Sequence, residues 1–233
     1  RSGAIWVGTY TAGIARIRGR RIDTFGREQG LPALEVRVLR EDRQGTIWAA
    51  TTAGIATSRD GRRFEPYAAP SDVDLQHVLC LLDDRNGVRW FGTAGYGLVR
   101  RDEAGFRVLT KRDGLVSDRI MSLHEDDDGH LWIGTAWSGL SLLRDGKVTS
   151  FRPADGLVEG RIHVILEDGR GGLWFTGNRG FQRLLKHELL AFAPGRSHPI
   201  RALSFGAADG LRSASFAGGQ QPAQHQPDDE HHG

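Results

Sequence analysis

The 233-residue sequence lacks several features that would place it in a familiar class. It has a single cysteine, Cys80, so no internal disulfide framework can form. Cys80 lies in the apolar run 78–82, where we expect it to be buried as a small hydrophobic side chain. No apolar run approaches the roughly 18–20 residues that a membrane helix requires, and no signal peptide is visible.

The sequence also has no large excess of positive or negative charge. The formal net charge is only +2, and the lysines and arginines are spread among the acids. Without a basic run or an arginine-rich helix, we expect no nucleic-acid partner. The chain opens inside a repeat, at Gly3-Ala4-Ile5-Trp6, without a methionine. We therefore expect it to be a piece of a longer protein, so the lack of a targeting signal says nothing about the location of the parent.

What the sequence does contain is an internal repeat. Tryptophan returns at a constant interval of 42 residues, at Trp6, Trp48, Trp90, Trp132 and Trp174. An aspartate stands six residues before four of these tryptophans, at Asp42, Asp84, Asp126 and Asp168. A fixed period of this size indicates a repeat architecture.

The clearest unit is 114–155, which predicts four short strands separated by turns. The expected strands are Ile120–Glu125, Leu131–Thr135, Leu140–Leu143 and Lys147–Phe151. The turns carry Asp-Gly pairs, the strongest short hairpin signal. Four antiparallel strands in 42 residues match one blade of a β-propeller. The unit shows no 3.6-residue period, which excludes a helical solenoid, and a β-sandwich would not repeat itself so strictly.

The sequence therefore predicts an all-β fold, a β-propeller with four-stranded antiparallel blades. We expect five blades plus a partial one over residues 1–221, forming part of a seven-bladed ring. The period breaks after Trp174, where residues of about 185–193 have the composition of a short helix inserted before an outer strand at 200–205. The polar tail 222–233 is expected to be loop or disordered.

The repeated residues are expected to serve the fold. Each tryptophan should pack between adjacent blades, and each aspartate should cap the following turn with its side chain. The glycines after tryptophan, such as Gly92 and Gly134, should allow a neighbouring backbone to approach closely. The dense acidic turn 126–129 lacks the later glutamate of the helix-loop-helix calcium motif, so we predict no metal site and no cofactor.

At this point the repeat resembles a known family. The pattern Gly-Leu-x-Ser, a short strand and Glu-Asp-x-x-Gly-x-Leu-Trp-Ile-Gly-Thr is similar to the two-component regulator propeller repeat, and Gly114–Leu140 is a near-complete example. The resemblance covers essentially residues 1–221. It implies the extracytoplasmic sensor propeller of a bacterial hybrid or sensor histidine kinase or of a diguanylate cyclase. The expected location is the periplasmic portion of an inner-membrane protein.

Function is expected where the repeats differ, in loops that open on one face of a propeller around its channel. These loops precede the inner strands or join the second strand to the third. Their variable residues are Tyr10, Glu35, His77, Tyr96, Arg119, Trp137, Arg161, Asn178 and Arg179. Arginines suit carboxylate or sulfate groups, and aromatic faces suit sugar rings. We expect a small extracellular ligand, with an oligosaccharide as one candidate, and no catalytic residue; ordinary loop polarity is the competing interpretation.

Two other functions stay open. The chain can instead be a protein-interaction or dimerisation platform, and we expect a homodimer in the parent receptor. It can also be a propeller lyase or glycosidase, which would need an acid–base pair from His77, His163 and Glu159. The histidines and aspartates of the tail, from His225 to His232, fit a solvated segment better than a metal site.

Overall fold

The computed structural model describes residues 3–192 and 200–212, which form five antiparallel sheets in chain order. The first sheet has three strands, β1 (Ile5–Gly8), β2 (Ile14–Arg18) and β3 (Arg21–Phe25). The second comprises β4 (Val36–Glu41), β5 (Ile47–Thr51), β6 (Gly54–Ser58) and β7 (Glu65–Pro66). The third comprises β8 (Val78–Asp83), β9 (Arg89–Thr93), β10 (Leu98–Asp102) and β11 (Gly105–Leu109).

The last two sheets follow the same plan, so the predicted propeller fold is confirmed. The fourth comprises β12 (Ile120–Glu125), β13 (Leu131–Thr135), β14 (Leu140–Arg144) and β15 (Lys147–Phe151). The fifth comprises β16 (Val164–Glu167), β17 (Gly172–Thr176), β18 (Phe181–Leu185) and β19 (Leu203–Phe205). The first sheet contains three strands, and in the described residues no strand pairs with the free edge of β1.

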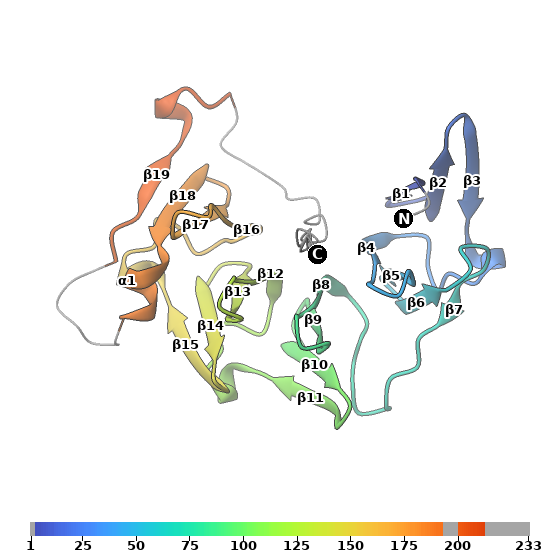
Figure 1. Ribbon diagram of the computed structural model, residues 1–233, viewed down its shortest axis with the longest axis horizontal. Helices are drawn as coiled ribbons and strands as arrows, with labels where there is room; N and C mark the ends of the chain where they lie inside the picture. The colour runs from blue at the N-terminus through green and yellow to red at the C-terminus, as the bar shows by residue number, and fades with distance from the viewer. Residues whose placement is uncertain (1–2, 193–199, 213–233) are drawn as a thin grey trace, which may run out of the picture.

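The sheets are arranged as the blades of an open arc (Figure 1). The first strands of the complete blades, β4, β8, β12 and β16, lie toward the centre, and their outer strands lie toward the rim. Neighbouring inner strands contact one another across the blade boundaries. No ladder joins the fifth sheet to the first within the described residues, so the arc is part of a propeller, and a total of seven blades stays a prediction.

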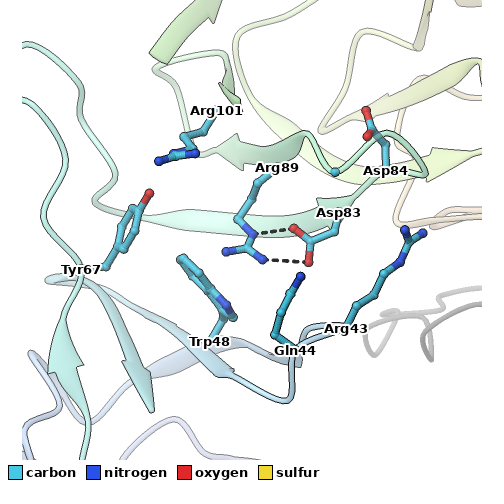
Figure 2. Close-up of a pocket in the computed structure, with 9 residues that line it drawn as sticks. Arg43, Gln44, Trp48, Tyr67, Asp83, Asp84, Arg89 and Arg101 are labelled. Atoms are coloured by element: carbon cyan, nitrogen blue, oxygen red, sulfur yellow. Dashed lines mark hydrogen bonds and ion pairs between the residues drawn. The ribbon is translucent and has the colours of Figure 1, made fainter. Parts of the chain in front are cut away.

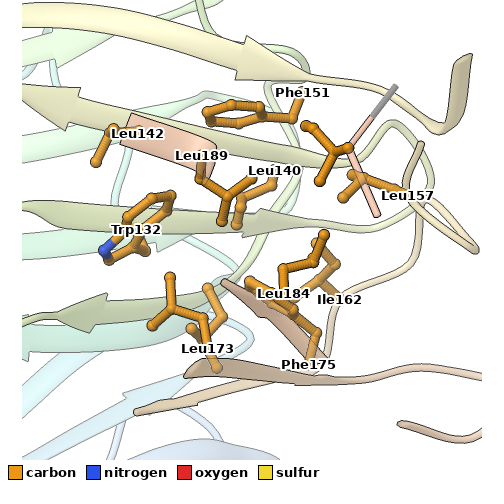
Figure 3. Packing of buried hydrophobic residues seen from close by; sticks show 12 residues of the cluster. Trp132, Leu140, Leu142, Phe151, Leu157, Ile162, Leu173, Phe175, Leu184 and Leu189 are labelled. Carbon is orange, nitrogen blue, oxygen red and sulfur yellow. The ribbon is translucent and has the colours of Figure 1, made fainter. Parts of the chain in front are cut away.

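The hydrophobic core lies between the blades. Trp132 is fully buried in a cluster that also contains Ile165, Leu173 and Phe175 of the next blade (Figure 3). Trp48 packs in the same way with Val78 of the following blade. The predicted packing of tryptophan between blades is therefore confirmed, and each blade covers the apolar face of its neighbour.

The aspartate before each tryptophan caps the turn between the first two strands, as predicted. Asp126 Oδ1 accepts the backbone N–H groups of Asp128 and His130 at 3.0 and 2.9 Å. Its Oδ2 accepts the indole N–H of Trp132 at 2.9 Å. Burial alone would raise the pKa of Asp126, but these hydrogen bonds hold it below its usual value. One carboxylate therefore fixes both the turn and the orientation of the indole.

Short 3₁₀ turns carry the chain from one blade to the next. They span Arg27–Gln29, Lys111–Asp113, Pro153–Asp155 and Ala207–Asp209. A glycine with positive φ ends each turn, as at Gly114, where φ is 102°. Such a backbone is unstrained only for glycine, which explains the Gly-Leu pair that follows each of these four turns.

The glycine after tryptophan works differently from the prediction. A Cβ at Gly134 would stand 2.7 Å from Cγ2 of Ile162 in the next blade and closer still to the Ser122 hydroxyl. Gly92 faces Ile120 and Cys80 in the same manner. The glycine therefore makes room for neighbouring side chains, and not chiefly for a neighbouring backbone.

The region where the period breaks contains α1 (Lys186–Leu190), directly after β18. Leu189 of α1 is buried in the core between the last two blades. The outer strand β19 starts at Leu203, three residues later than the 200–205 interval predicts. In the described residues no helix is long and apolar enough to cross a membrane. The predicted tail 222–233 lies outside the described residues.

Candidate functional site

The predicted site positions lie at one end of the blades, because backbone hydrogen bonds join the two kinds of loop. The N–H groups of Thr52, Ala94 and Ala136, just after the second strands, donate to the carbonyls of Glu35, His77 and Arg119. The N–H of Ile162 donates to Thr135 O of the preceding blade at 3.0 Å. The residues that precede the inner strands are thus fixed next to the loops that follow the second strands.

Local irregularities accompany these positions. The ladder between the first two strands shifts register at Val36/Val38, at Val78/Cys80 and at Ile120/Ser122, directly after three of the predicted site residues. A bulge bends a strand and changes the direction of nearby side chains. His77 also has a positive φ of 53°, which is uncommon outside glycine.

Three of the predicted residues form one cluster, which we call the arginine–tryptophan cluster: Arg119, Trp137 and Arg161. The guanidinium carbons of Arg119 and Arg161 lie 5.1 and 4.9 Å from the centroid of the Trp137 ring. Trp137 is 61% exposed although it is flanked by two cations. Such an indole offers an apolar surface and nearby positive charge to a ligand.

The cluster spans two blades. Arg119 precedes β12, Trp137 follows β13 in the same blade, and Arg161 precedes β16 of the next blade. Arg161 Nε donates to the carbonyl of Ala136 at 3.1 Å, which fixes its side chain beside the Trp137 loop. Arg119 Nε is buried and has no hydrogen-bond partner in the described residues.

The other predicted residues are not part of this cluster. Tyr96 donates its hydroxyl to Asp72 O at 2.5 Å, and Glu35 pairs with Arg37 at 2.9 Å. Tyr10 is 77% exposed and follows β1 in the first sheet. His77 is exposed as well. Asn178 and Arg179 lie together in the loop of the last blade.

The residues of the alternative acid–base pair are engaged elsewhere. His163 Nε2 lies 3.3 Å from Asn178 Oδ1. Glu159 Oε1 accepts the backbone N–H of Arg179 at 3.3 Å. No hydrogen bond or ion pair joins Glu159 to His77 or His163 within residues 3–192 and 200–212. The structure therefore does not assemble an acid–base pair from these three side chains.

The acidic turn of the fourth blade contacts a lysine of the inserted helix. Lys186 Nζ lies 2.6 Å from Glu167 Oε1, 2.9 Å from Asp128 Oδ2 and 3.7 Å from Asp126 Oδ2. Burial alone would lower the pKa of Lys186, but these carboxylates raise it above its usual value. Asp126, Asp128 and His130 have ligand atoms close enough to share a cation. The lysine ammonium already supplies a positive charge there.

Sequence reasoning missed a pocket at the other end of the blades. It has a volume of about 340 Å³ and lies between the second and third blades, beside Trp48, Asp83 and Arg89 (Figure 2). The guanidinium carbon of Arg89 lies 3.7 Å from the Trp48 ring centroid. A signal existed: the residue before the repeated tryptophan is Ile or Leu in the other four units, and only the third unit has an arginine.

The fold and the repeat define the chain as a β-propeller. Comparison with known proteins identifies the family of the repeat. Residues 30–53 and 114–137 match the family described as two component regulator propeller. The chain therefore carries two-component regulator propeller repeats, and the resemblance is confirmed in two of its units. No curated protein matches the sequence significantly.

Solved structures share the fold. The extracellular domain of hybrid two component system BT3049 from B. thetaiotaomicron has a TM-score of 0.77 at 23% identity, over 93% of this chain and 29% of that one. The extracellular domain of system BT4673 from the same organism has a TM-score of 0.70 at 18% identity, over 88% and 30%. The chain thus spans about three tenths of these proteins.

An enzyme has the same fold. A catalytically inactive virginiamycin B lyase from Staphylococcus aureus, solved with quinupristin, has a TM-score of 0.64 at 20% identity, over 93% of this chain and 70% of that one. At these identities the likeness establishes the fold alone. Sensor and lyase functions must therefore be separated by the site and by experiment.

Proposed function

We propose that the chain is a ligand-recognition propeller in the extracytoplasmic part of a bacterial signal-transduction receptor. The family of the repeat supports a role in two-component signalling. The parent receptor is a homodimer at the inner membrane, and its output domain is a histidine kinase or a diguanylate cyclase. The propeller itself performs no catalysis and either binds a small extracellular molecule or transmits its binding.

One observation carries the location of the ligand site: the exposed Trp137 with two arginines beside it. An indole face suits the apolar face of a sugar ring, and guanidinium groups suit carboxylate or sulfate substituents. The guanidinium carbons of Arg119 and Arg161 lie 5.1 and 4.9 Å from the ring centroid, so both charges stand next to a sugar stacked on the indole. An oligosaccharide with acidic groups fits this cluster, and Arg119, Trp137 and Arg161 are its contact residues in our proposal.

The test compares acidic oligogalacturonides with neutral cello-oligosaccharides by isothermal titration calorimetry on the full chain. Replacement of Trp137 by Ala should abolish binding of the acidic sugars. Single Arg119→Ala and Arg161→Ala changes should each weaken it by roughly tenfold or more. Ile22→Ala removes an exposed apolar side chain far from the cluster and is the matched control. Binding that all three cluster variants retain would refute the proposed site.

The lyase fold favours a second candidate, a propeller lyase or glycosidase. It predicts that the chain consumes a substrate, and it needs catalytic groups other than a pair formed by His77, Glu159 and His163, which the structure does not bring together. Incubation of the same oligosaccharides with the chain, followed by mass spectrometry of the products, separates the two functions. Stoichiometric binding without products supports the sensor, whereas new products support the enzyme.

A further inference from the structure

The pocket between the second and third blades lies at the opposite end of the blades from the arginine–tryptophan cluster. Its walls include the turn that follows β4 and the turn that follows β8. Glu35 precedes β4 and Asp42 follows it, so the six residues of the strand separate the two ends. A ligand in this inter-blade pocket would therefore not compete for the proposed sugar site.

The acceptors around the inter-blade pocket are already engaged. Asp83 receives Nε and Nη2 of Arg89 at 2.5 and 3.1 Å. Asp42 receives the Trp48 indole N–H at 2.8 Å and Arg89 Nη2 at 3.1 Å. Asp84 receives the indole N–H of Trp90 at 2.9 Å and two backbone N–H groups. No carboxylate here lacks donors.

Several hydrogen-bond donors on the pocket walls, in contrast, have no partner within the described residues. Arg43 and Arg101 are exposed on its walls, and neither has an ion pair or side-chain hydrogen bond within the described residues. The Tyr67 hydroxyl and the Gln44 side chain also have no hydrogen bond there. Figure 2 shows Arg101 and Tyr67 on one side of the Arg89–Asp83 pair and Arg43 on the other. The pocket thus offers donors and aromatic surface but has no free acceptor among its carboxylates.

The charges around the pocket agree with this excess of free donors over free acceptors. Three guanidinium groups line the pocket, from Arg43, Arg89 and Arg101, against the two carboxylates of Asp83 and Asp84. Arg40 and Asp42 lie behind this lining. Burial lowers the pKa of Arg40, and the positive charges of Arg89 and Arg43 lower it further, against the opposing effect of Asp83 and Asp42. Arg40 Nε is also buried without a hydrogen-bond partner. An anion in the pocket would offset this excess of positive charge.

We propose that the inter-blade pocket is a second binding site, which takes a small organic carboxylate. Arg101 and the Tyr67 hydroxyl bind a carboxylate on one side of the Arg89–Asp83 pair, and Arg43 and the Gln44 amide bind a second carboxylate of the same ligand on the other side. The half-buried Tyr67 ring contacts the carbon skeleton. A volume of about 340 Å³ is at the small end of ligand pockets, which favours a metabolite-sized anion over an oligosaccharide.

Such a ligand would connect two blades. Arg43, Gln44 and Tyr67 belong to the second blade unit, and Arg101 belongs to the third. A ligand held by both blades adds contacts across a boundary that is otherwise closed by apolar packing and by the Arg89 ion pairs. Binding should therefore raise the thermal stability of the full chain in proportion to occupancy.

The experiment titrates the full chain with succinate and citrate by calorimetry and records the shift of the melting temperature. Inorganic phosphate and neutral glycerol serve as comparison probes. We expect succinate or citrate to bind and to raise the melting temperature, and glycerol to do neither. Arg101→Ala and Arg43→Ala should each weaken binding by roughly tenfold to a hundredfold. Arg107→Ala, on the outer strand of the third blade, is the matched control, because Arg107 is exposed and outside the pocket.

Three results would overturn the proposal: no binding of either carboxylate, binding that Arg43→Ala and Arg101→Ala leave unchanged, or phosphate binding as tightly as the carboxylates. Tyr67→Phe keeps the ring and removes only the hydroxyl, so it tests the site without disturbing the packing between blades. We expect a smaller loss of affinity for Tyr67→Phe than for Arg101→Ala. Because the arginine–tryptophan cluster is untouched by these variants, failure here leaves the proposed sensor function intact.

Discussion

The indole N–H of Trp132 donates to Oδ2 of Asp126 at 2.9 Å, and both side chains are completely buried. The same pair occurs between Asp42 and Trp48, between Asp84 and Trp90 and between Asp168 and Trp174, at 2.8 to 3.0 Å. The interval of six residues joins the end of the first strand to the second strand. The pair therefore fixes the hairpin while the indole packs between blades.

The first prediction concerns this pair. Trp132→Phe keeps an aromatic ring in the core but removes the N–H donor from a buried carboxylate. We expect a loss of about 1–3 kcal/mol in the free energy of unfolding, because Asp126 Oδ2 loses its indole donor and keeps His130 Nδ1 at 3.1 Å, and because the smaller ring leaves space in the core. Urea denaturation measures the loss. Trp174→Phe is the matched control and should cost less, because Asp168 is more exposed and also receives Arg183 at 2.8 Å.

The second prediction is a loss of stability in acid. Burial alone would raise the pKa values of Asp42 and Asp126, but donors from Trp48 and Trp132 lower them below the unfolded value. A lowered pKa adds stability above the unfolded pKa of about 3.9, and the contribution disappears as pH falls through the folded pKa. The free energy of unfolding should decline steadily below about pH 4.

Asp126→Asn tests the source of that decline. The variant should be less stable at neutral pH, because a single amide oxygen replaces two carboxylate oxygens. Its stability should then change less with pH in acid, since one titrating group is gone. If the variant and the parent chain lose stability in parallel below pH 4, other carboxylates cause the effect.

These pairs also show how far the sequence could predict the structure. The 42-residue period was sufficient to predict the strands and the packing of tryptophan, because every unit repeats the same local pattern. It also predicted that aspartate caps the turn. The indole–carboxylate bond was not predicted, since the period reveals spacing and not the direction in which a side chain points.

Contacts between units were the least predictable. Lys186 reaches Asp128 across 58 positions and from a helix that no other unit has, so no repeat comparison could place it. Arg89 reaches Asp42 and Trp48 of the previous blade, although its departure from the apolar pattern was visible. For the candidate site, loop position indicated Arg119, Trp137 and Arg161, but only the structure brings them within cation–π distance and leaves six other predicted residues outside.

A third prediction follows from the close contact at Gly134. Gly134→Ala forces a methyl group against Ile162 of the next blade and the Ser122 hydroxyl. Overpacking of this kind should destabilise the chain by about 1–3 kcal/mol. Combination with Ser122→Ala, which removes the atom nearest to the new methyl group, should recover part of the loss, as judged by thermal unfolding. The control position is Gly95, which has open space around it and no positive φ. Gly146 would not serve, because its φ of 74° strains an alanine. Gly95→Ala should be close to neutral.

The fourth prediction concerns the single cysteine. Although Cys80 is only half-buried as a residue, burial raises the pKa of its thiol to about 12. The thiolate is the reactive form, so the folded chain should react very slowly with Ellman's reagent at about pH 8. Unfolding in urea restores an ordinary thiol and should make the reaction rapid. Fast modification of the native chain would mean that the boundary between the third and fourth blades opens readily, since the Cys80 sulfur lies 4.0 Å from Ile120 O.

The last prediction concerns the open end of the arc. Within the described residues β1 pairs only with β2, and Ile5 and Val7 on β1 are 62% and 39% exposed. An unpaired, apolar strand edge is a template for pairing with another chain. We therefore expect the chain to associate or aggregate as its concentration rises, which sedimentation velocity measures.

Val7→Lys places a charge on this edge and should suppress association. Val158→Lys adds the same charge to an exposed loop valine and should not, because that residue lies outside any strand. A chain that stays monomeric and unfolds cooperatively would contradict this expectation, because it would mean that the edge is protected without a partner strand.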